Sequence, residues 1–350
     1  MAAGAAMSAS RDDIPPLPRR IQLEVTRSCN LRCTMCLVSY RPVPNRTEGS
    51  MDLATFRAIV DELPELETIQ LQGLGEPLLA PDLFAMIEYA AARGVRVGFN
   101  TNAMLLSPSR GERLIRGGLD WLHISIDGAT AETYEAIRGG ASFDRVCANV
   151  SAFVATKRRL AAQNPTLELV FVAMRRNIAE LPDLVRMAAR WGIERIHVQN
   201  LSHSFEDTDD LAGYREIQRF TLAEALWSAR DRTRADEAID RARREASRLG
   251  IRLRVPKLVA PDDGDDVSAM RRPGTPGCFW PWEQTYVHHD GRVQPCCMVM
   301  GEDRAVLGDA RAEGFASVWS GDAYTRFREQ LMSGRPPEVC AGCSLYRGVF

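Results

Sequence analysis

Hydrophobic and polar residues alternate in short runs that recur along the first 200 residues of the chain. Runs typical of β-strands cover residues 21–25, 68–71, 95–99, 121–126, 167–173 and 195–198. Apolar residues recur at helical spacing over residues 51–63, 81–93, 110–116, 131–137, 143–160 and 181–191. Six strands that alternate with helices predict an α/β fold with a parallel sheet and helical crossovers. A doubly wound sheet and a partial barrel both fit this pattern.

The pattern changes after residue 205. Residues 211–249 form a charged segment with one apolar helical face, and residues 261–266 are an acidic loop with the composition of a linker. An Asp-Gly pair at residues 290–291 predicts a hairpin between residues 285–287 and 292–293. We therefore expect four parts, which are a disordered segment at 1–19, the α/β domain at 20–205, a helical connector and linker at 206–271, and a small C-terminal domain at 272–350.

Composition excludes several functional classes. The chain has 350 residues, of which 45% are hydrophobic and 26% charged, the usual balance of a globular protein. Its net charge of -2 gives no bulk attraction to nucleic acid or to anionic membranes. No apolar run approaches the ~18 residues of a membrane span, and the first residues lack the pattern of a secretory signal. We therefore expect a cytoplasmic protein without a nucleic-acid or membrane partner.

Cysteine is the most informative residue type in this chain. The nine cysteines are Cys29, Cys33, Cys36, Cys147, Cys278, Cys296, Cys297, Cys340 and Cys343. An odd number, grouped mainly toward the two ends, argues against a disulfide framework. Metal or redox chemistry is the better interpretation.

The first three cysteines are spaced C-x3-C-x2-C, directly after the first predicted strand. Three thiolates on one loop can bind three irons of a [4Fe-4S] cube. The fourth iron is then open for a small chelating ligand, as is typical of a reactive metal site. Zinc is the alternative because thiolates also select it, but zinc normally takes four ligands and no fourth Cys or His is close in sequence.

This spacing resembles the signature of the radical S-adenosylmethionine (SAM) enzymes. The resemblance implies a partial (β/α)6 barrel, with the cysteine loop after its first strand. It also implies that SAM chelates the open iron through its amino and carboxylate groups, and that an electron from the reduced cluster releases a 5'-deoxyadenosyl radical. The residue before the third cysteine, Met35, is expected to pack near the adenine.

Further motifs match the SAM-binding positions of that family. Residues 73–77, Gly-Leu-Gly-Glu-Pro, resemble the GGEP motif, and Glu76 is expected to accept a hydrogen bond from the SAM ammonium group. Arg138 resembles the arginine that pairs with the SAM carboxylate. The resemblance implies SAM contacts at Met35, Gly73, Gly75, Glu76, Pro77, Asn102, Ser125, Asp127 and Arg138. Gln199, after the sixth predicted strand, is expected from its position alone to meet the adenine edge. An ordinary turn or a surface polar group is the alternative for each position.

A second set of cysteines resembles the SPASM/twitch domains found at the C-terminus of many radical SAM enzymes. It consists of Cys278, Cys296, Cys340 and Cys343. Four thiolates close a cluster completely, so the resemblance implies the shorter twitch form with one auxiliary [4Fe-4S] cluster. The spacing is similar to that of the aminocyclitol dehydrogenases, and a four-cysteine zinc site is the alternative.

Two cysteines remain outside these sets. Cys297 follows Cys296 on the predicted hairpin, so it should point to the opposite face and be a bystander, although an exchange of ligand between the two stays open. Cys147 lies in a predicted helix and is expected to be a small buried apolar residue.

The resemblance implies SAM and two [4Fe-4S] clusters as cofactors, with flavodoxin or ferredoxin as the electron donor. A fully ligated second cluster has no open iron for a substrate, so we expect it to accept an electron from the substrate. The expected reaction is the oxidation of an alcohol on a small sugar-like or aminocyclitol-like molecule. One alternative is a maturase that forms a crosslink or thioether in a ribosomally made peptide, and another is a zinc-binding scaffold. No catalytic base can be assigned, since the candidates rest on position alone: Arg175, Arg176, His197, His203 and Glu283.

Overall fold

The computed structural model describes residues 14–41, 49–208, 214–226, 229–256, 277–301 and 304–346. The linker expected at residues 261–266 and the first 13 residues of the expected disordered segment lie outside these ranges.

A sheet of ten strands organises the chain, in the order β12-β11-β10-β1-β3-β4-β5-β7-β8-β9. Its parallel part consists of β1 (Arg20–Leu23), β3 (Thr68–Leu71), β4 (Arg96–Thr101), β5 (Trp121–Ser125), β7 (Thr166–Val172), β8 (Arg195–Gln199) and β9 (Arg252–Arg254). Strands that follow one another in sequence are neighbours throughout, whereas a doubly wound sheet reverses its strand order. The partial barrel is therefore confirmed, and β9 is a further parallel strand that the sequence pattern did not predict.

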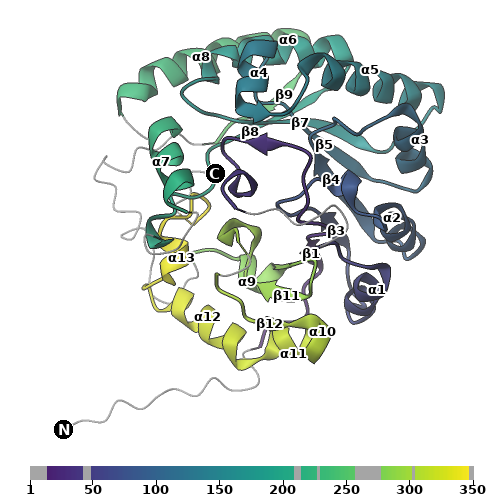
Figure 1. Cartoon of the computed structure of the whole chain (residues 1–350), viewed down its shortest axis with the longest axis vertical. Helices are drawn as coiled ribbons and strands as arrows, with labels where there is room; N and C mark the ends of the chain where they lie inside the picture. Colours follow the sequence, from purple (N-terminus) through teal and green to yellow (C-terminus); the bar gives the residue numbers. More distant parts are fainter. Residues whose placement is uncertain are drawn as a thin grey trace.

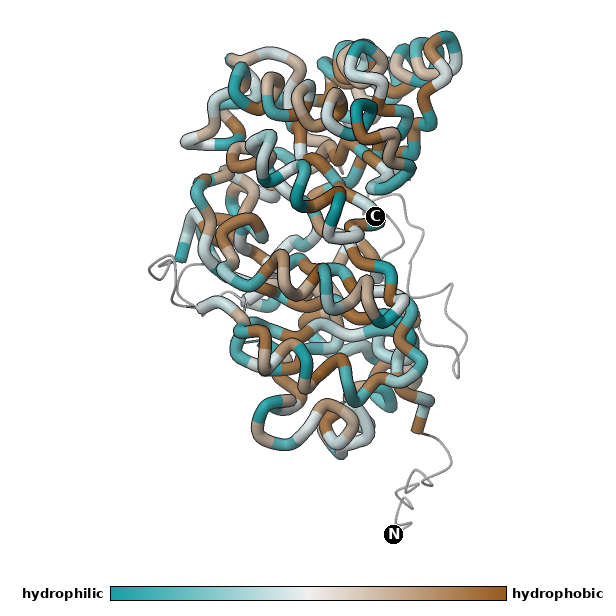
Figure 2. The backbone as a smooth tube through the Cα atoms, turned by 90° about the vertical axis from the view of Figure 1, so that its right-hand side faces the viewer, coloured by the Kyte–Doolittle hydropathy of each residue, from teal (hydrophilic) through white to brown (hydrophobic). Residues whose placement is uncertain are grey.

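Helices cover the outer side of the arc of strands (Figure 1). They are α1 (Leu53–Asp61), α2 (Leu83–Ala92), α3 (Pro108–Arg116), α4 (Ala131–Ile137), α5 (Phe143–Arg159), α6 (Leu181–Trp191) and α8 (Ala229–Leu249). One continuous core joins strand residues such as Leu71 and Ile124 to helix residues such as Phe56 and Ile87. Figure 2 shows brown and teal segments alternating along the helices, as expected for amphipathic helices with one buried face. Because side chains alternate along a strand, the polar residues between the core residues lie on the inner face of the arc.

The C-terminal part extends the sheet at the β1 edge. It contains α9 (Trp280–Glu283), β10 (Gln284–Val287), β11 (Arg292–Gln294), β12 (Gly308–Asp309), α10 (Ala310–Glu313), α11 (Phe315–Ser320), α12 (Asp322–Met332) and α13 (Glu338–Ala341). Strand β10 pairs in parallel with β1, and β10 and β11 form the predicted antiparallel hairpin. The backbone of His203, after β8, forms a bridge with Cys343. The C-terminal part thus contacts both sides of the open barrel and completes the ring seen in Figure 1.

Two further features complete the fold. The charged segment predicted at 211–249 forms α7 (Arg215–Glu224) and α8, and α8 packs beside α6. Residues 14–19, part of the segment expected to be disordered, are held in place, because the Trp319 indole donates to the carbonyl oxygens of Pro15 and Pro16, both at 3.1 Å. Among the described residues, no helix has the length and apolar character needed to cross a membrane.

Two cysteine sets and the candidate active site

The first cysteine set lies on a loop that is fixed from two sides. Strand β2 (Arg32–Cys33) pairs antiparallel with β6 (Arg138–Gly139), which places Cys33 opposite Arg138. Within the loop, the Cys36 amide donates to the Cys33 carbonyl at 3.1 Å. The Ser39 hydroxyl donates to the same carbonyl at 2.6 Å. The loop therefore has a defined shape before any cofactor is considered.

The three thiols of this loop interact electrostatically with one another. Burial raises the pKa of Cys29 to about 11 and that of Cys36 to about 12, and their mutual charges with Cys33 add to the rise. Such groups are protonated at neutral pH unless a metal takes the place of the proton. Thiolates are the ligands that iron–sulfur clusters require, so the donor set fits a cluster with three protein ligands.

Arg138 and Asp127 form a buried ion pair beside this loop. Arg138 Nη2 lies 2.6 Å from Asp127 Oδ2, and Arg138 Nη1 lies 3.9 Å from the Cys33 sulfur. Burial opposes the charge of the guanidinium, but the carboxylate of Asp127 outweighs it and raises the pKa of Arg138. Arg138 Nε is buried without a hydrogen-bond partner in the described part of the chain. An orphaned donor next to the thiols fits a ligand carboxylate, as the resemblance implies for SAM.

Glu76 is buried, and its carboxylate already accepts three hydrogen bonds from the chain. The donors are the Thr101 hydroxyl at 2.7 Å, the Asn102 amide at 2.8 Å and the Leu78 amide at 3.2 Å. Burial raises the pKa of Glu76. In this arrangement Glu76 joins the loops after β3 and β4, and the expected hydrogen bond from the SAM ammonium group stays a prediction.

The two glycines of the 73–77 motif allow close contact between loops. A Cβ atom on Gly75 would lie 2.2 Å from the Thr26 carbonyl oxygen, and one on Gly73 would lie 2.2 Å from the Glu24 side chain. Only residues without a Cβ can bring this loop so close to the cysteine loop. Pro77 then begins a short 3-10 helix (Pro77–Leu79). The motif thus supports the cysteine loop directly.

The remaining predicted SAM contacts lie at the same edge of the sheet. Met35 packs with a small apolar cluster that includes Ile137 and Met174. The side-chain amide of Asn102 donates to the Asn30 side chain at 3.0 Å, which connects the loop after β4 to the cysteine loop. Ser125 and Gln199 are partly exposed at the ends of β5 and β8. Loops after parallel strands form the ligand face of such folds, so these positions are consistent with the prediction.

The second cysteine set comes together from three segments. Cys278 precedes α9, Cys296 follows β11, and Cys340 and Cys343 belong to the turn at α13. Burial raises the pKa of Cys296, and the charges of Cys297, Cys343, Cys340 and Cys278 add to the rise, so these thiols lie within electrostatic reach of Cys296. Within the described residues, no three His, Cys, Asp or Glu side chains are grouped as a ready-made site for a metal ion. The chemistry of the sulfur donors, rather than their spacing, is therefore the basis for assigning a cluster here.

Cys297 belongs to this second group, contrary to the expectation that it points to the opposite face. Burial raises its pKa to about 12, with contributions from Cys343 and Cys278. Strand β11 ends at Gln294 and a 3-10 helix (Cys297–Val299) begins after Cys296, so strand alternation does not extend to Cys297. Cys297 is therefore a further thiol within electrostatic reach of the second set. Whether Cys297 is a bystander or a ligand stays a prediction.

The loop after β8 holds the C-x2-C turn. The Ser204 amide donates to the Gly342 carbonyl at 3.0 Å, and the Ser344 amide donates to the Ser202 carbonyl at 3.1 Å. The His203 ring lies between two backbone groups, with Nε2 2.8 Å from the Val339 carbonyl and Nδ1 accepting from the Phe205 amide at 2.8 Å. Both ring nitrogens are therefore engaged in structure, which argues against His203 as a base.

Sequence reasoning missed Glu24, which lies directly after β1 and links the two domains. Its carboxylate accepts from the Tyr286 hydroxyl at 2.8 Å and lies 3.0 Å from His289 Nδ1 and 3.4 Å from His288 Nδ1. Burial alone would raise the pKa of Glu24, but the hydrogen bonds and charges of the two histidines outweigh it and hold the pKa well below its usual range. The signal was a charged residue between two apolar strand positions, which predicts a buried partner.

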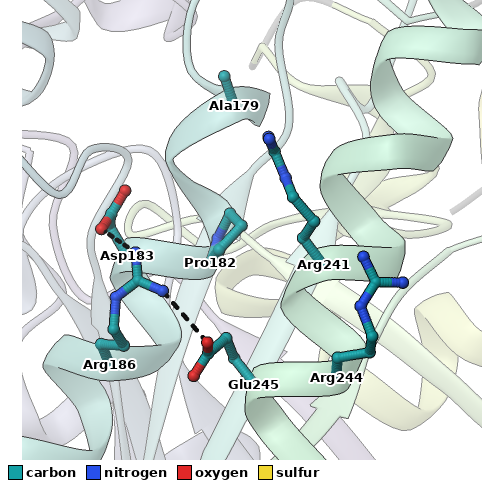
Figure 3. Close-up of a pocket in the computed structure, with 7 residues that line it drawn as sticks. All are labelled: Ala179, Pro182, Asp183, Arg186, Arg241, Arg244 and Glu245. Atoms are coloured by element: carbon teal, nitrogen blue, oxygen red, sulfur yellow. Dashed lines mark hydrogen bonds and ion pairs between the residues drawn. The ribbon is translucent and has the colours of Figure 1, made fainter.

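A pocket of about 290 Å³ lies elsewhere, between α6 and α8 (Figure 3). Arg186 pairs there with Asp183 and lies 3.5 Å from Glu245, while Arg241 and Arg244 line the other side. This pocket contains no cysteine and is on the outer side of the barrel. It is therefore separate from the candidate cofactor sites.

Comparison with known families agrees with both cysteine sites. Residues 23–161 match the radical SAM superfamily, and residues 278–344 match the SPASM iron–sulfur cluster-binding domain. The chain is a radical SAM protein with a C-terminal SPASM domain. These two domains imply SAM and two [4Fe-4S] clusters as cofactors, and the iron–sulfur match disfavours the zinc alternative.

Several curated proteins are similar to this radical SAM protein. The mycofactocin maturase MftC of Mycobacterium tuberculosis is 34% identical over 187 residues, which is 53% of the chain but only 45% of the maturase. The PqqA peptide cyclase of Xanthomonas campestris is 28% identical, over 94% of the chain and 80% of the cyclase. The AdoMet-dependent heme synthase of Methanosarcina barkeri is 27% identical, over 93% of the chain and 91% of the synthase.

Among solved structures, SuiB of Streptococcus suis bound to the precursor peptide SuiA has a similar fold. Its TM-score is 0.65 at 16% identity, over 95% of this chain and 70% of SuiB. At this identity the likeness concerns the fold, which includes both the barrel and the SPASM domain.

Proposed function

We propose that this radical SAM protein oxidises a ribosomally made peptide, forming a crosslink or thioether. The observation that favours a peptide most is the alignment with the PqqA peptide cyclase, which extends over both domains and 94% of the chain. The similar fold of SuiB, solved with a precursor peptide, is consistent with it. The small-molecule alcohol expected from the cysteine spacing has less support among these relatives.

The residues of the chain have distinct tasks in this proposal. Cys29, Cys33 and Cys36 hold the first cluster, and the donor set of Cys278, Cys296, Cys340 and Cys343 holds the second. When bound, SAM and the first cluster supply the ability to remove a hydrogen atom from an unactivated carbon. Arg138, oriented by Asp127, binds the SAM carboxylate through its free Nε donor.

The second site is suited to electron transfer in this proposal. Its four expected ligands leave no open iron, and the loop after β8 fixes its C-x2-C turn against the barrel. The substrate radical that remains after loss of the hydrogen atom would pass one electron to this site, and flavodoxin or ferredoxin would serve as the external donor for the first cluster.

Oxidation of a small molecule is the second candidate. The heme synthase alignment over 93% of the chain favours it, because that protein is named for a small-molecule product.

The test is to produce the chain anaerobically with each short peptide encoded beside its gene and to examine the peptides by mass spectrometry. A peptide that loses two hydrogens with the wild-type chain, and remains unmodified with Cys33→Ala, supports the proposal. If no peptide changes mass while a small metabolite from the same cells is oxidised, the small-molecule candidate replaces it.

A further inference from the structure

Three polar side chains form a row on the inner face of the barrel. Asn100 on β4 is directly opposite His123 on β5, and His123 is directly opposite Glu168 on β7. Neighbouring strands are about 4.8 Å apart, so these side chains lie next to one another. The flanking strand residues Ile124 and Leu169 belong to the core under the helices, which confirms that the row faces inward.

The hydrogen-bonding pattern of this row leaves no hydrogen between His123 and Glu168. As the Asn100 amide is oriented, its Oδ1 lies 3.1 Å from His123 Nδ1, and an amide oxygen can only accept. His123 Nδ1 therefore has the hydrogen, and Nε2 of the neutral ring is an acceptor. Nε2 faces Glu168 Oε2, another acceptor, at 3.4 Å. Two acceptors that face each other without a hydrogen between them form a place for one more proton.

The surroundings disfavour the charged form of both partners and leave the pair partly exposed. Burial lowers the pKa of His123 to about 4, and the charges of Arg195 and of His197, when the latter is protonated, add to this effect. Burial raises the pKa of Glu168, against the opposing charges of Arg195, Arg254 and Arg252. The His123 and Glu168 side chains remain 26% and 21% exposed, so the inner face is not sealed.

We propose that the His123–Glu168 pair accepts the proton that a substrate on the inner face releases when it is oxidised. The proposal rests on the proposed function. Formation of a bond between a carbon and a heteroatom X, from C–H and X–H, releases one hydrogen atom, one electron and one proton. The hydrogen atom passes to the SAM-derived carbon centre and the electron to an oxidised iron–sulfur cluster, while the proton passes to the pair. The substrate class is a peptide with an ionisable thiol, hydroxyl or amide.

The position of the pair agrees with this role. His123 is on the same face of β5 as Ser125, two residues away at the end of the strand. Two residues of strand correspond to about 7 Å, so the pair lies deeper in the barrel than Ser125, a residue predicted to contact SAM. A substrate that reaches both sites would extend along the inner face of β5.

The first experiment needs no substrate. The anaerobically reconstituted protein, with its clusters oxidised, is labelled with ¹⁵N-histidine, and the His123 signals are identified among the five histidines by their loss in His123→Gln. We expect a neutral ring with the hydrogen on Nδ1 at pH 7. A ring that is protonated, or that has its hydrogen on Nε2, overturns the proposal.

The second experiment uses the peptide identified by the test of the proposed function, deuterated at the reacting carbon. In Glu168→Gln the amide can donate to His123 Nε2, so the row keeps its geometry but loses its place for a proton. We expect product formation to fall by about 100-fold or more, the usual contribution of a general base. Deuterium transfer into 5'-deoxyadenosine should change little in this variant. In the wild-type chain, product formation should fall toward low pH as the pair takes up a proton, and this fall should be absent in Glu168→Gln.

The control is Glu112→Gln on the outer side of α3, where Glu112 pairs with Arg116 and Arg159, and it should leave both rates unchanged. If Glu168→Gln lowers product formation and deuterium transfer in parallel, or lowers neither, the pair is not a proton acceptor. If the wild-type chain modifies no peptide, the proposed function fails. The histidine spectrum still decides whether a hydrogen is missing between His123 and Glu168.

Discussion

Arg138 Nη1 lies 3.9 Å from the sulfur of Cys33. The two residues face each other where β6, after α4, pairs with β2 of the cysteine loop. The same guanidinium is held by Asp127, which in turn accepts from the Val172 amide at 2.8 Å. One buried cation therefore connects the cysteine loop to the ends of β5 and β7.

This connection makes Asp127 essential to the stability of the site. Asp127→Asn leaves Arg138 buried without its counter-charge, and breaking a buried pair in this way costs about 3–5 kcal/mol. We expect a lower midpoint of chemical unfolding and weaker SAM binding. The control Asp240→Asn, in an exposed pair with Arg243, should change neither property. An unchanged midpoint in Asp127→Asn would show that the ion pair is not structural.

Gly75 should be indispensable for the first cluster only. In Gly75→Ala the new methyl would meet the backbone oxygens of Thr26 and Ser28 at 2.2 and 2.6 Å, so the cysteine loop must move. We expect loss of the iron of the first cluster and retention of the second, measured as iron per chain and by visible absorption. Gly250→Ala, at the end of α8 with open space around it, is the control for backbone strain alone, since Gly250 has a φ of +70°. Full iron content in Gly75→Ala would contradict this account of the motif.

Stability should decrease as the pH falls from about 6.5. Burial lowers the pKa of His197 from 6.5 to about 4, with a further contribution from Arg254. The unfolded chain then binds more protons than the folded one between these values, so stability is lost toward acid. Glu24, whose pKa is also lowered, acts only below its ordinary value of 4.5. His123, whose pKa burial likewise lowers to about 4, adds to the same loss. We expect unfolding midpoints to fall between pH 7.5 and 5.5 and His197→Gln to reduce the slope without removing it, whereas an equal slope in the variant would refute the assignment.

Cys297 and Cys147 should differ in their effect on the second cluster. Cys297 interacts with Cys343 and Cys278, whereas Cys147 is on α5, far along the chain from both sets. We expect Cys297→Ser to alter the paramagnetic spectrum of the reduced second cluster without loss of iron, and Cys147→Ser to leave it unchanged. If the spectrum of Cys297→Ser, like that of Cys147→Ser, is the same as that of the wild-type chain, Cys297 does not contact the cluster.

Much of the fold could be predicted from local pattern. Strands such as residues 121–125 follow from alternation, with apolar residues on one face and polar ones on the other, whereas β4 and β7 show as short apolar runs. Whether the sheet is a barrel depends on which strands pair, and this is not a local property. Strand β9 has only three residues, too few for a pattern, and forms because α8 returns the chain to the edge of β8.

The candidate site was predictable where spacing defines chemistry and not where distant residues meet. The two cysteine sets are visible in the sequence, as is the 73–77 motif. Local pattern could not give the direction of the Cys297 side chain, because β11 ends at Gln294 and a 3-10 helix begins at Cys297. The row of Asn100, His123 and Glu168 requires the strand register, since the three residues are separated by 23 and 45 positions.

The central claim is that Cys29, Cys33 and Cys36 leave one iron of a [4Fe-4S] cluster open to SAM. The most direct test is electron paramagnetic resonance of the anaerobically reconstituted and reduced variant in which Cys278, Cys296, Cys297, Cys340 and Cys343 are all alanine, so that only the first cluster contributes. The account predicts about four irons per chain and a spectrum that changes when SAM is added. A spectrum that is the same with and without SAM would contradict it.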